Sequence, residues 1–422
     1  MQQPHNHSPQ PQTAIIVGAG MVGLCCAYAL HTRGVQVTIV DRDPVGDKTS
    51  YGNAGALAVS ECVPHSLPGQ IWSIPQWLLD PMGPLSIRPG HIPQFLPWLV
   101  AYLGHSRKAQ VAHIAQALQA IHGRVNSDYA PLLADIGYAD KVRDKGCIRV
   151  YDNYKNFKKS ALEWNIRKQH GQDYELLGES DLRAAEPALG KAKTFGVLQP
   201  QWRIIDDPKA LVGCLRDWLI SKGVVVVSAN VDSIAVQGPR ATGVNCSTGF
   251  IGADQTIVAA GAWSKELASQ VGERCLLESE RGYNTTLPNP NIELNHELLF
   301  AEQMFVASPL SIGLRVGGAS EFAGLKAAPN YKRSDNLLKL AQRYMPDLAT
   351  QGGTQWMGHR PSTPDSLPVL GPSQKWQGLG YAFGHSHLGM TQAASSGQML
   401  AEALLEPEKG TDLSAYSISR FN

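Results

Sequence analysis

Three glycines near the start of the chain have the spacing of a turn that contacts phosphate. Gly18, Gly20 and Gly23 form a G-x-G-x-x-G pattern directly after a short apolar run. The first glycine permits a tight bend, the second lets the backbone approach a pyrophosphate, and the third lets the next helix pack against the strand. The amino end of that helix offers free N–H groups and a partial positive charge. The segment is therefore typical of a nucleotide site.

The residues around this turn favour a nucleotide site over a plain structural turn. Residues 13–17 and 35–40 are apolar runs typical of strands buried on both faces. Residues 24–33 between them have a helical pattern that ends at Gly34. Asp41 closes the second strand, where an acid can accept hydrogen bonds from ribose hydroxyls. NAD and FAD share this fingerprint, so it does not choose between them.

Two further loops favour a flavin. Residues 49–55 (TSYGNAG) form a polar, glycine-rich segment without a helix or strand pattern. Residues 384–391 (GHSHLGMT) lie between an expected strand at 379–383 and a closing helix at 389–405. A helix start of this kind points backbone N–H groups at an anionic acceptor. Reduced flavin carries negative charge near its N1 atom, which such a helix end would stabilise.

Arg360 is the candidate for binding a carboxylate. It stands in the segment GHRPSTPD, and its planar guanidinium matches a carboxylate with two parallel hydrogen bonds. The alternative is a structural arginine in a turn around Pro361 and Pro364. Tyr283, in RGYN, could place its hydroxyl on the same carboxylate or be a half-buried strand residue.

The strands and helices expected around these residues predict an α/β protein. The chain has 422 residues, which indicates two domains or one domain with a large insertion. Further strands are expected at residues 146–152, 224–228, 231–236, 241–246, 255–259 and 299–316. Further helices are expected at 111–136, 156–169, 179–185, 208–222 (capped by Asp206 or Asp207) and 338–343. Arg315 and Glu321, in a strand-like segment, are interpreted as paired charges.

Composition excludes several classes of protein. Hydrophobic residues make up 43% and charged residues 17% of the chain, and the net charge is +1, so neither a disordered chain nor a nucleic-acid-binding protein is expected. Seven cysteines without C-x-x-C spacing fit a reducing compartment. None of the 13 histidines forms a convincing metal site. Residues 1–12 are expected to be a disordered lead without a targeting signal.

Residues 71–105 are rich in tryptophan and proline, and the prolines exclude one long helix. Aromatic residues of this kind could contact a membrane surface. The favoured interpretation is that they pack within a substrate domain. We therefore expect a cytoplasmic protein, with contact to the inner face of the membrane as the alternative.

The chain resembles the D-amino acid dehydrogenase branch of the family that also holds glycine oxidase, sarcosine oxidase and D-amino acid oxidase. The matching segments are IIVGAGMVGLCCAYAL, TSYGNAGALA, PLSIRP, VAAGAWS, RVGGASE, GHRPSTPDSLPVLGP and GHSHLGMT, which span nearly the whole chain. The resemblance implies a discontinuous Rossmann-type FAD-binding domain and a substrate domain with a mixed β-sheet capped by helices. Residues 13–65, 190–265 and 355–422 would form the first domain, and residues 66–189 and 266–354 the second.

The resemblance also assigns roles to individual residues. The cofactor set is Gly18, Gly20, Gly23, Asp41, Arg42, Ser50, Asn53, Ala54, Val231, Ala260, Gly261, Trp263, Gly384, His385, Leu388, Gly389, Met390 and Thr391. Arg360 matches the arginine that binds the substrate carboxylate. His387 falls where relatives carry a side chain that faces the substrate, and His385 is expected to touch the flavin.

The implied reaction is hydride transfer from the α carbon of a D-amino acid to flavin N5. No protein base is strictly required, which suits a sequence without an obvious buried carboxylate pair. The segment GHSHLGMT resembles relatives that act on D-proline or cis-4-hydroxy-D-proline, and the expected electron acceptor is a quinone or another acceptor that is not oxygen. The alternatives are an oxidase that uses oxygen and releases peroxide, a flavin-dependent 2-hydroxy acid dehydrogenase with His387 as base, and a flavin-binding protein without activity.

Overall fold

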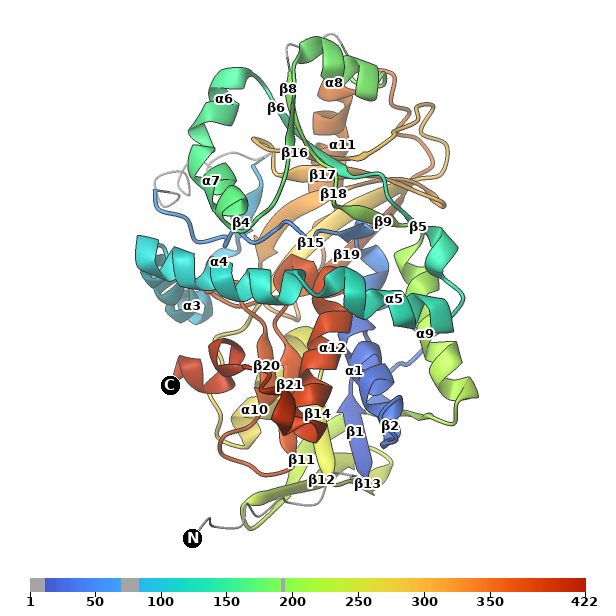
Figure 1. Ribbon diagram of the computed structural model, residues 1–422, viewed down its shortest axis with the longest axis vertical. Coiled ribbons are helices and arrows are strands. Elements are labelled where there is room, and N and C mark those ends of the chain that lie inside the picture. The colour runs from blue at the N-terminus through green and yellow to red at the C-terminus, as the bar shows by residue number, and fades with distance from the viewer. Residues whose placement is uncertain (1–11, 70–82, 191–193) are drawn as a thin grey trace.

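The computed structural model describes residues 12–69, 83–190 and 194–422. Two large sheets dominate it, one in the lower half of Figure 1 and one in the upper half. Helices α4 (Lys108–His122) and α5 (Val125–Asp135) run across the middle of the molecule between them. The predicted α/β class is confirmed.

The lower sheet has six strands. In sheet order they are β10 (Val225–Ser228), β2 (Gln36–Asp41), β1 (Thr13–Val17), β14 (Gln255–Val258), β21 (Leu379–Phe383) and β20 (Val369–Pro372). All neighbouring strands are parallel except the last pair, β21 and β20. Strands β14 and β21 are buried along their whole length. Helices cover one face of the sheet, and residues of the segments 229–246 and 267–277 pack on the other.

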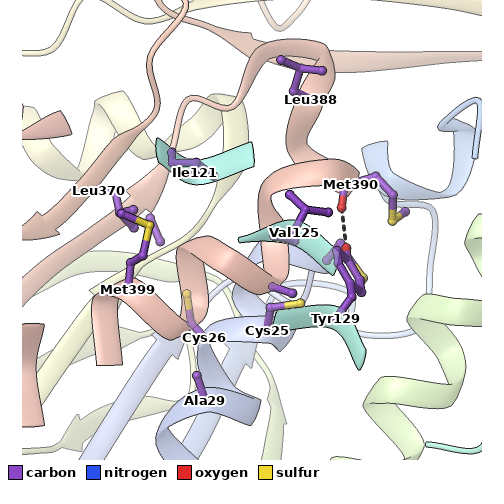
Figure 2. Close-up of a cluster of buried hydrophobic side chains, with 14 of the residues drawn as sticks. Cys25, Cys26, Ala29, Ile121, Val125, Tyr129, Leu370, Leu388, Met390 and Met399 are labelled. Carbon is purple, nitrogen blue, oxygen red and sulfur yellow. Dashed lines mark hydrogen bonds between the residues drawn. The ribbon is translucent and has the colours of Figure 1, made fainter. Parts of the chain in front are cut away.

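Helices α1 (Met21–His31) and α12 (Gly389–Leu405) lie side by side on this sheet. Their backbones can approach closely because residue 397 is a glycine: a Cβ there would lie 2.5 Å from the carbonyl oxygen of Cys25. Figure 2 shows the apolar cluster that α4 and α5 complete over this pair, with Val125 and Tyr129 near the amino end of α12. The Tyr129 hydroxyl donates to the carbonyl oxygen of Met390 in the first turn of α12.

The upper sheet has nine strands. Along the main path they are β19 (Thr354–Ser362), β15 (Glu278–Leu287), β18 (Gly313–Phe322), β17 (Phe305–Leu310), β16 (Glu297–Phe300), β6 (Cys147–Tyr151), β8 (Phe195–Gln199) and β7 (Glu175–Leu177), and β4 (Leu85–Ile87) pairs with β18. One face packs on α8 (Glu179–Ala185) and α11 (Lys332–Tyr344). Because side chains alternate along a strand, the residues between those core positions line the opposite face.

The other elements are short. Two three-stranded sheets contain β11 (Val231–Gln237), β12 (Arg240–Cys246) and β13 (Gly249–Gly252), and β3 (Ala56–Leu57), β9 (Arg203–Ile205) and β5 (Val142–Arg143). The remaining helices are α3 (Ile92–Gly104), α6 (Tyr154–Lys159), α7 (Ala161–Gln169), α9 (Pro208–Ser221) and α10 (Ser264–Gln270). Asp207 caps α9, as predicted, by accepting from the amide of Lys209 at 2.8 Å.

Four helix predictions need correction. The helix predicted for residues 338–343 is α11, which spans Lys332–Tyr344. Helix α1 begins at Met21, inside the glycine pattern, because Gly20 takes the extended conformation of an N-cap. The single helix predicted for residues 111–136 is two helices that meet at Gly123, and the one predicted for 156–169 is two that meet at Ser160. Small or capping residues at these points let the chain change direction.

The six-stranded sheet takes its strands from the three segments assigned by resemblance to the FAD-binding domain. Two strands of those segments, β8 and β19, pair in the nine-stranded sheet instead. Helices α4 and α5, from a segment assigned to the substrate domain, pack on α12 and α1 instead.

Helix α3 has two different faces. Phe95 and Trp98 are buried against Phe322, and the Trp98 indole donates to the carbonyl oxygen of Ser362 at 3.0 Å. On the other face Ile92, Leu96 and Val100 are exposed. Residues 70–82, which include Trp72 and Trp77, lie outside the described residues. Among the described helices none is long and apolar enough to cross a membrane.

Candidate active site

A cavity of about 1110 Å³ lies between the two large sheets. The carboxyl ends of β1, β2 and β14 form one side, where ligands bind in open α/β sheets. The inner face of the nine-stranded sheet forms the other side, through residues such as Arg149, Leu299, Gly317 and Arg360. The cavity thus brings the predicted nucleotide site and the predicted carboxylate site together.

The glycine pattern forms the turn that its spacing predicts. Gly18 has φ +116°, and a Cβ there would lie 2.5 Å from the carbonyl oxygen of Ala259. A Cβ on Gly23 would lie 2.0 Å from the carbonyl oxygen of Gly18, so this glycine allows helix α1 to pack on the turn. Gly20 is different: a Cβ would meet only the Ser50 hydroxyl, at 3.7 Å, and the residue lines the cavity. The space in front of helix α1 is therefore open for a ligand.

Asp41 fixes the edge of this turn. Its carboxylate accepts from the amide of Ala19 at 2.8 Å and from Lys48 Nζ at 2.9 Å. The guanidinium of Arg42 stacks 4.2 Å from the centre of the Trp263 ring. These side chains line the same end of the cavity, together with Val231, Ala260 and Gly261. The structure thus brings this part of the predicted cofactor set together.

The loop at residues 49–55 closes over the amino end of α1. The Ser50 hydroxyl accepts from the amide of Met21 at 3.1 Å. Arg315 lies behind the loop and donates through Nη1 to the carbonyl oxygens of Tyr51, at 3.0 Å, and Asn53, at 2.5 Å. Ser50, Asn53 and Ala54 all line the cavity. The predicted ion pair between Arg315 and Glu321 is wrong, since the Arg315 guanidinium binds the carbonyl oxygens of this loop instead.

The segment 384–391 runs along the cavity into helix α12. His385, Leu388, Gly389, Met390 and Thr391 line the wall. His385 is buried with Nε2 2.9 Å from the Ser396 hydroxyl, and burial lowers its pKa to about 3, so the ring is neutral.

Two residues of the same segment were not predicted correctly: Gly384 was expected to contact the flavin, and Ser386 was not assigned a role. Gly384 does not line the cavity: it has φ +83° and packs near Thr363, so it serves the turn and not the wall. Ser386, on the wall, has φ +50° although it is not a glycine, and its buried hydroxyl makes no hydrogen bond within the part of the chain that the structure describes. Such local strain is concentrated at ligand sites.

Arg360 lies in strand β19 and not in a turn. Its register partner on β15 is Glu280, and Nη1 donates to Glu280 Oε1 at 3.1 Å. The carbonyl oxygen of Ala319, which has φ +54°, accepts from the same nitrogen at 3.1 Å. The guanidinium lies over Gly282 on the cavity wall and remains partly exposed. A planar cation is thus held in a fixed position on the cavity wall.

Burial opposes ionisation of Glu280, but Arg360 and the hydroxyls of Ser320 and Ser362 hold its pKa below the usual range. Glu280 is therefore charged and balances the guanidinium.

Tyr283 also lines the cavity, but its hydroxyl is bonded to residues other than Arg360 and Glu280. Its hydroxyl donates to Glu321 Oε2 at 2.5 Å and accepts from the amide of Asn330 at 3.1 Å. Its ring packs in the apolar core between the sheet and helix α11. Successive side chains of β15 point to opposite faces, and Arg360 lies over the preceding residue, Gly282. That this hydroxyl shares a substrate carboxylate with Arg360 stays a prediction.

His387 lines the cavity and contacts a histidine that the sequence did not reveal. Its Nδ1 lies 3.0 Å from His65 Nε2, and the ring centres are 4.6 Å apart. Part of the His387 ring is exposed to the cavity, and protein atoms surround the rest. This desolvation and the neighbouring His65 lower the pKa of His387 below its usual range. His387 is therefore neutral at neutral pH.

Buried carboxylates also line the cavity, contrary to the expectation from sequence. Burial opposes ionisation of Glu61, but Arg167 at 2.6 Å and Arg149 at 2.9 Å lower its pKa to about 2. Burial raises the pKa of Glu297 to about 8, and its Oε2 has no hydrogen-bond partner among the described residues. No motif marks Glu61, since its two arginine partners lie 88 and 106 residues away in the sequence and reach it only after folding.

Comparison with known proteins shows the family to which the chain belongs. Residues 13–403 match the family of FAD dependent oxidoreductases. A D-amino-acid oxidase of Bradyrhizobium diazoefficiens is 34% identical over 98% of this chain and 100% of its own. A D-amino acid dehydrogenase of the same organism is 30% identical over 96% of this chain and 98% of its own.

The fold also occurs in solved structures. The glycine oxidase from Geobacillus kaustophilus superposes with a TM-score of 0.74 and 19% identity, over 97% of this chain and 98% of that one. At this identity the match concerns the fold alone.

Proposed function

The chain belongs to the family of FAD-dependent oxidoreductases, and on that basis we propose that it oxidises a D-amino acid at the α carbon. The observation that carries the proposal is Arg360: a fixed, partly exposed guanidinium on the wall of the cavity that the nucleotide turn enters. A protein that only bound a flavin would not need it. The names of the two bacterial relatives, an oxidase and a dehydrogenase of D-amino acids, support the same substrate class.

The residues of the cavity fit FAD. Helix α1 has no side chain as N-cap, and a Cβ at Gly20 would project into the open space before it, which leaves room for a pyrophosphate. Asp41 and Val231 would hold the adenosine end, and Ser50 and Asn53 the phosphates. The amino end of the 17-residue helix α12 would stabilise negative charge on the flavin. Gly23 and Gly384 would support the site through packing and turn geometry.

The protein groups bind, orient and exclude water. Arg360 would take the substrate carboxylate with paired hydrogen bonds, and Glu280 keeps the guanidinium in place while the substrate is absent. His385, whose ring is hydrogen-bonded to Ser396, is a neutral part of the cavity wall formed by residues 384–391. Bound FAD supplies the acceptor for two electrons and the α hydrogen. Orientation of the substrate provides much of the rate enhancement.

We extend the proposal to substrate and acceptor. The segment GHSHLGMT supports D-proline or cis-4-hydroxy-D-proline as substrate, and the dehydrogenase relative supports a quinone or another acceptor that is not oxygen. A quinone dissolved in a membrane would require peripheral contact, for which the exposed Ile92, Leu96 and Val100 of α3 are the candidate surface.

An amino acid oxidase is the second candidate, because a relative at 34% identity is named a D-amino-acid oxidase. Such an enzyme would pass electrons to oxygen and release peroxide. A 2-hydroxy acid dehydrogenase is the third, because His387 on the cavity wall could take a hydroxyl proton.

The test is anaerobic reduction of the purified flavoprotein by a panel of D- and L-amino acids and 2-hydroxy acids. Bleaching of the flavin absorbance by D-amino acids is the expected result, with cyclic D-amino acids fastest. Re-oxidation by a soluble quinone and by air, compared at equal concentration, identifies the acceptor. The variant Arg360→Lys should lower kcat/KM by about 10²-fold, because one ammonium replaces a paired contact worth roughly 3 kcal/mol. Bleaching by 2-hydroxy acids alone would sink the amino acid proposal.

A further inference from the structure

Two histidines from distant parts of the chain share one hydrogen on the cavity wall. His65 belongs to the loop after β3, and His387 belongs to the turn before α12. The distance of 3.0 Å between His65 Nε2 and His387 Nδ1 is that of a hydrogen bond between two rings. Both residues line the cavity, and both are exposed. The other histidines of this region are placed differently: His385 is enclosed and bonded to Ser396.

This contact fixes what each ring can do. A neutral imidazole has one donor nitrogen and one acceptor nitrogen. If His387 Nδ1–H donates to His65, then His387 Nε2 is an acceptor, and the described residues make no hydrogen bond to it. In the same state His65 carries its hydrogen on Nδ1, which also has no partner among the described residues. The pair then has an acceptor at one end and a donor at the other.

The charges around the pair suit a transient positive charge. Glu61 from the same loop and Glu280 from β15 stabilise a proton on His387, whereas Arg360 from β19 and His65 itself oppose it. Because the ring is neutral at rest, a proton received by His387 would not stay there. His65 is the direct outlet, since the two rings are already hydrogen-bonded.

We propose that His65 and His387 form a relay that removes a proton from the ammonium group of the substrate and passes it to water, an inference that rests on the proposed amino acid oxidation. An amino acid in neutral solution carries an ammonium group, which has no lone pair, so it must lose one proton before the α hydrogen can leave as hydride. His387 Nε2 accepts that proton, His387 Nδ1 gives its hydrogen to His65 Nε2, and His65 Nδ1 releases its hydrogen to water. One N–H bond forms and one breaks on each ring, and exchange with water in the open cavity restores the starting tautomers.

The relay is tested by the pH dependence of anaerobic flavin reduction by a D-amino acid in the variants His65→Gln and His387→Gln. His113→Gln is the matched control, because His113 is exposed on α4 and does not line the cavity. Near neutral pH we expect His65→Gln to slow reduction about a hundredfold, at the lower end of the range for general base catalysis. The deficit should shrink toward about pH 10, where the free amine already predominates. Added imidazole should partly restore His65→Ala.

Binding of benzoate, followed by its perturbation of the flavin spectrum, separates a relay from a structural role. Benzoate has a carboxylate but no ammonium proton, so its dissociation constant should be the same in His65→Gln and in the unchanged protein. Reduction of His65→Gln at the unchanged rate and with the unchanged pH profile overturns the relay while amino acid oxidation stands. A deficit that is equal at all pH values and accompanied by weaker benzoate binding also overturns it. If no D-amino acid reduces the unchanged protein, the proposed function fails, and the relay fails with it.

Discussion

The guanidinium of Arg360 occupies the space in which a side chain at position 282 would lie. A Cβ on Gly282 would be 2.3 Å from Arg360 Nη2 and 2.4 Å from Cζ. The two residues belong to neighbouring strands, β15 and β19, whose register sets Arg360 opposite Glu280. The glycine therefore creates the place in which the guanidinium rests, and Glu280 keeps it there.

The variant Gly282→Ala should displace Arg360 from this position. We expect the dissociation constant for benzoate or for a D-amino acid to rise about tenfold or more, which corresponds to roughly 1.4 kcal/mol of binding free energy. The measurement is a titration followed by the flavin absorbance. Gly213→Ala is the control: a Cβ there meets nothing within 4 Å, and an alanine inside α9 should stabilise the fold by about 0.5–1 kcal/mol. Unchanged binding in Gly282→Ala would show that Arg360 does not depend on this space.

Arg315 should control retention of the flavin. It is buried, burial lowers its pKa to about 10, and its Nη1 holds the loop carbonyls of Tyr51 and Asn53. In Arg315→Met these carbonyls lose their donor, so the loop around Ser50 loosens and the dissociation constant of FAD should rise roughly tenfold to a hundredfold.

Equilibrium dialysis with detection of free flavin fluorescence measures this change without any assay of activity. Arg183→Met is the control, because Arg183 forms an exposed ion pair with Glu179 on α8. Equal FAD affinity in Arg315→Met and the control would contradict a role for Arg315 in the loop.

The cysteines should be almost unreactive in the folded protein. Six of the seven are buried and Cys214 is half-buried. Burial raises the pKa of Cys26 to about 12 and that of Cys62 to about 11, so the reactive thiolate is scarce at neutral pH. Figure 2 shows Cys25 and Cys26 within the apolar cluster of α1. A thiol reagent such as Ellman's reagent should modify at most one cysteine rapidly, and Cys214→Ser should remove that reaction. Rapid reaction of several thiols in Cys214→Ser would be incompatible with the packing described.

The sequence predicted the parts of the site whose signal is local. The spacing of Gly18, Gly20 and Gly23 after an apolar run specifies a turn between β1 and α1, because each glycine has a steric role within a few residues. Asp41 follows from the same unit. The closing helix α12 was predicted within its observed limits, since residues 389–405 carry a continuous helical pattern.

The parts that depend on strand register could not be predicted. Whether Tyr283 or its neighbours face the cavity is decided by which residue of β15 lies opposite Arg360, and a shift by one residue would exchange the two faces. The contact of His65 with His387 joins residues 322 positions apart. The role of Glu280 was missed for the same reason, since nothing near position 280 marks it as the partner of Arg360.

Glu297 should make the stability of the protein fall with rising pH. It is buried in β16, and burial raises its pKa from 4.5 to about 8, with Ser308 opposing the shift. Between these two values the folded protein binds a proton that the unfolded chain does not. The stabilisation is therefore complete below about pH 4.5 and is lost as the pH rises through about 8.

Within this window each unit of pH increase should lower the free energy of unfolding by about 1.4 kcal/mol. Glu297→Gln has no carboxyl to ionise, so it should escape this decline, and its stability relative to the unchanged protein should increase steadily as the pH is raised. Urea unfolding at several pH values measures the difference. Glu179→Gln, on the exposed surface of α8, should follow the unchanged protein at every pH. A difference between Glu297→Gln and the unchanged protein that does not vary with pH would mean that Glu297 is ionised in the folded protein despite its burial.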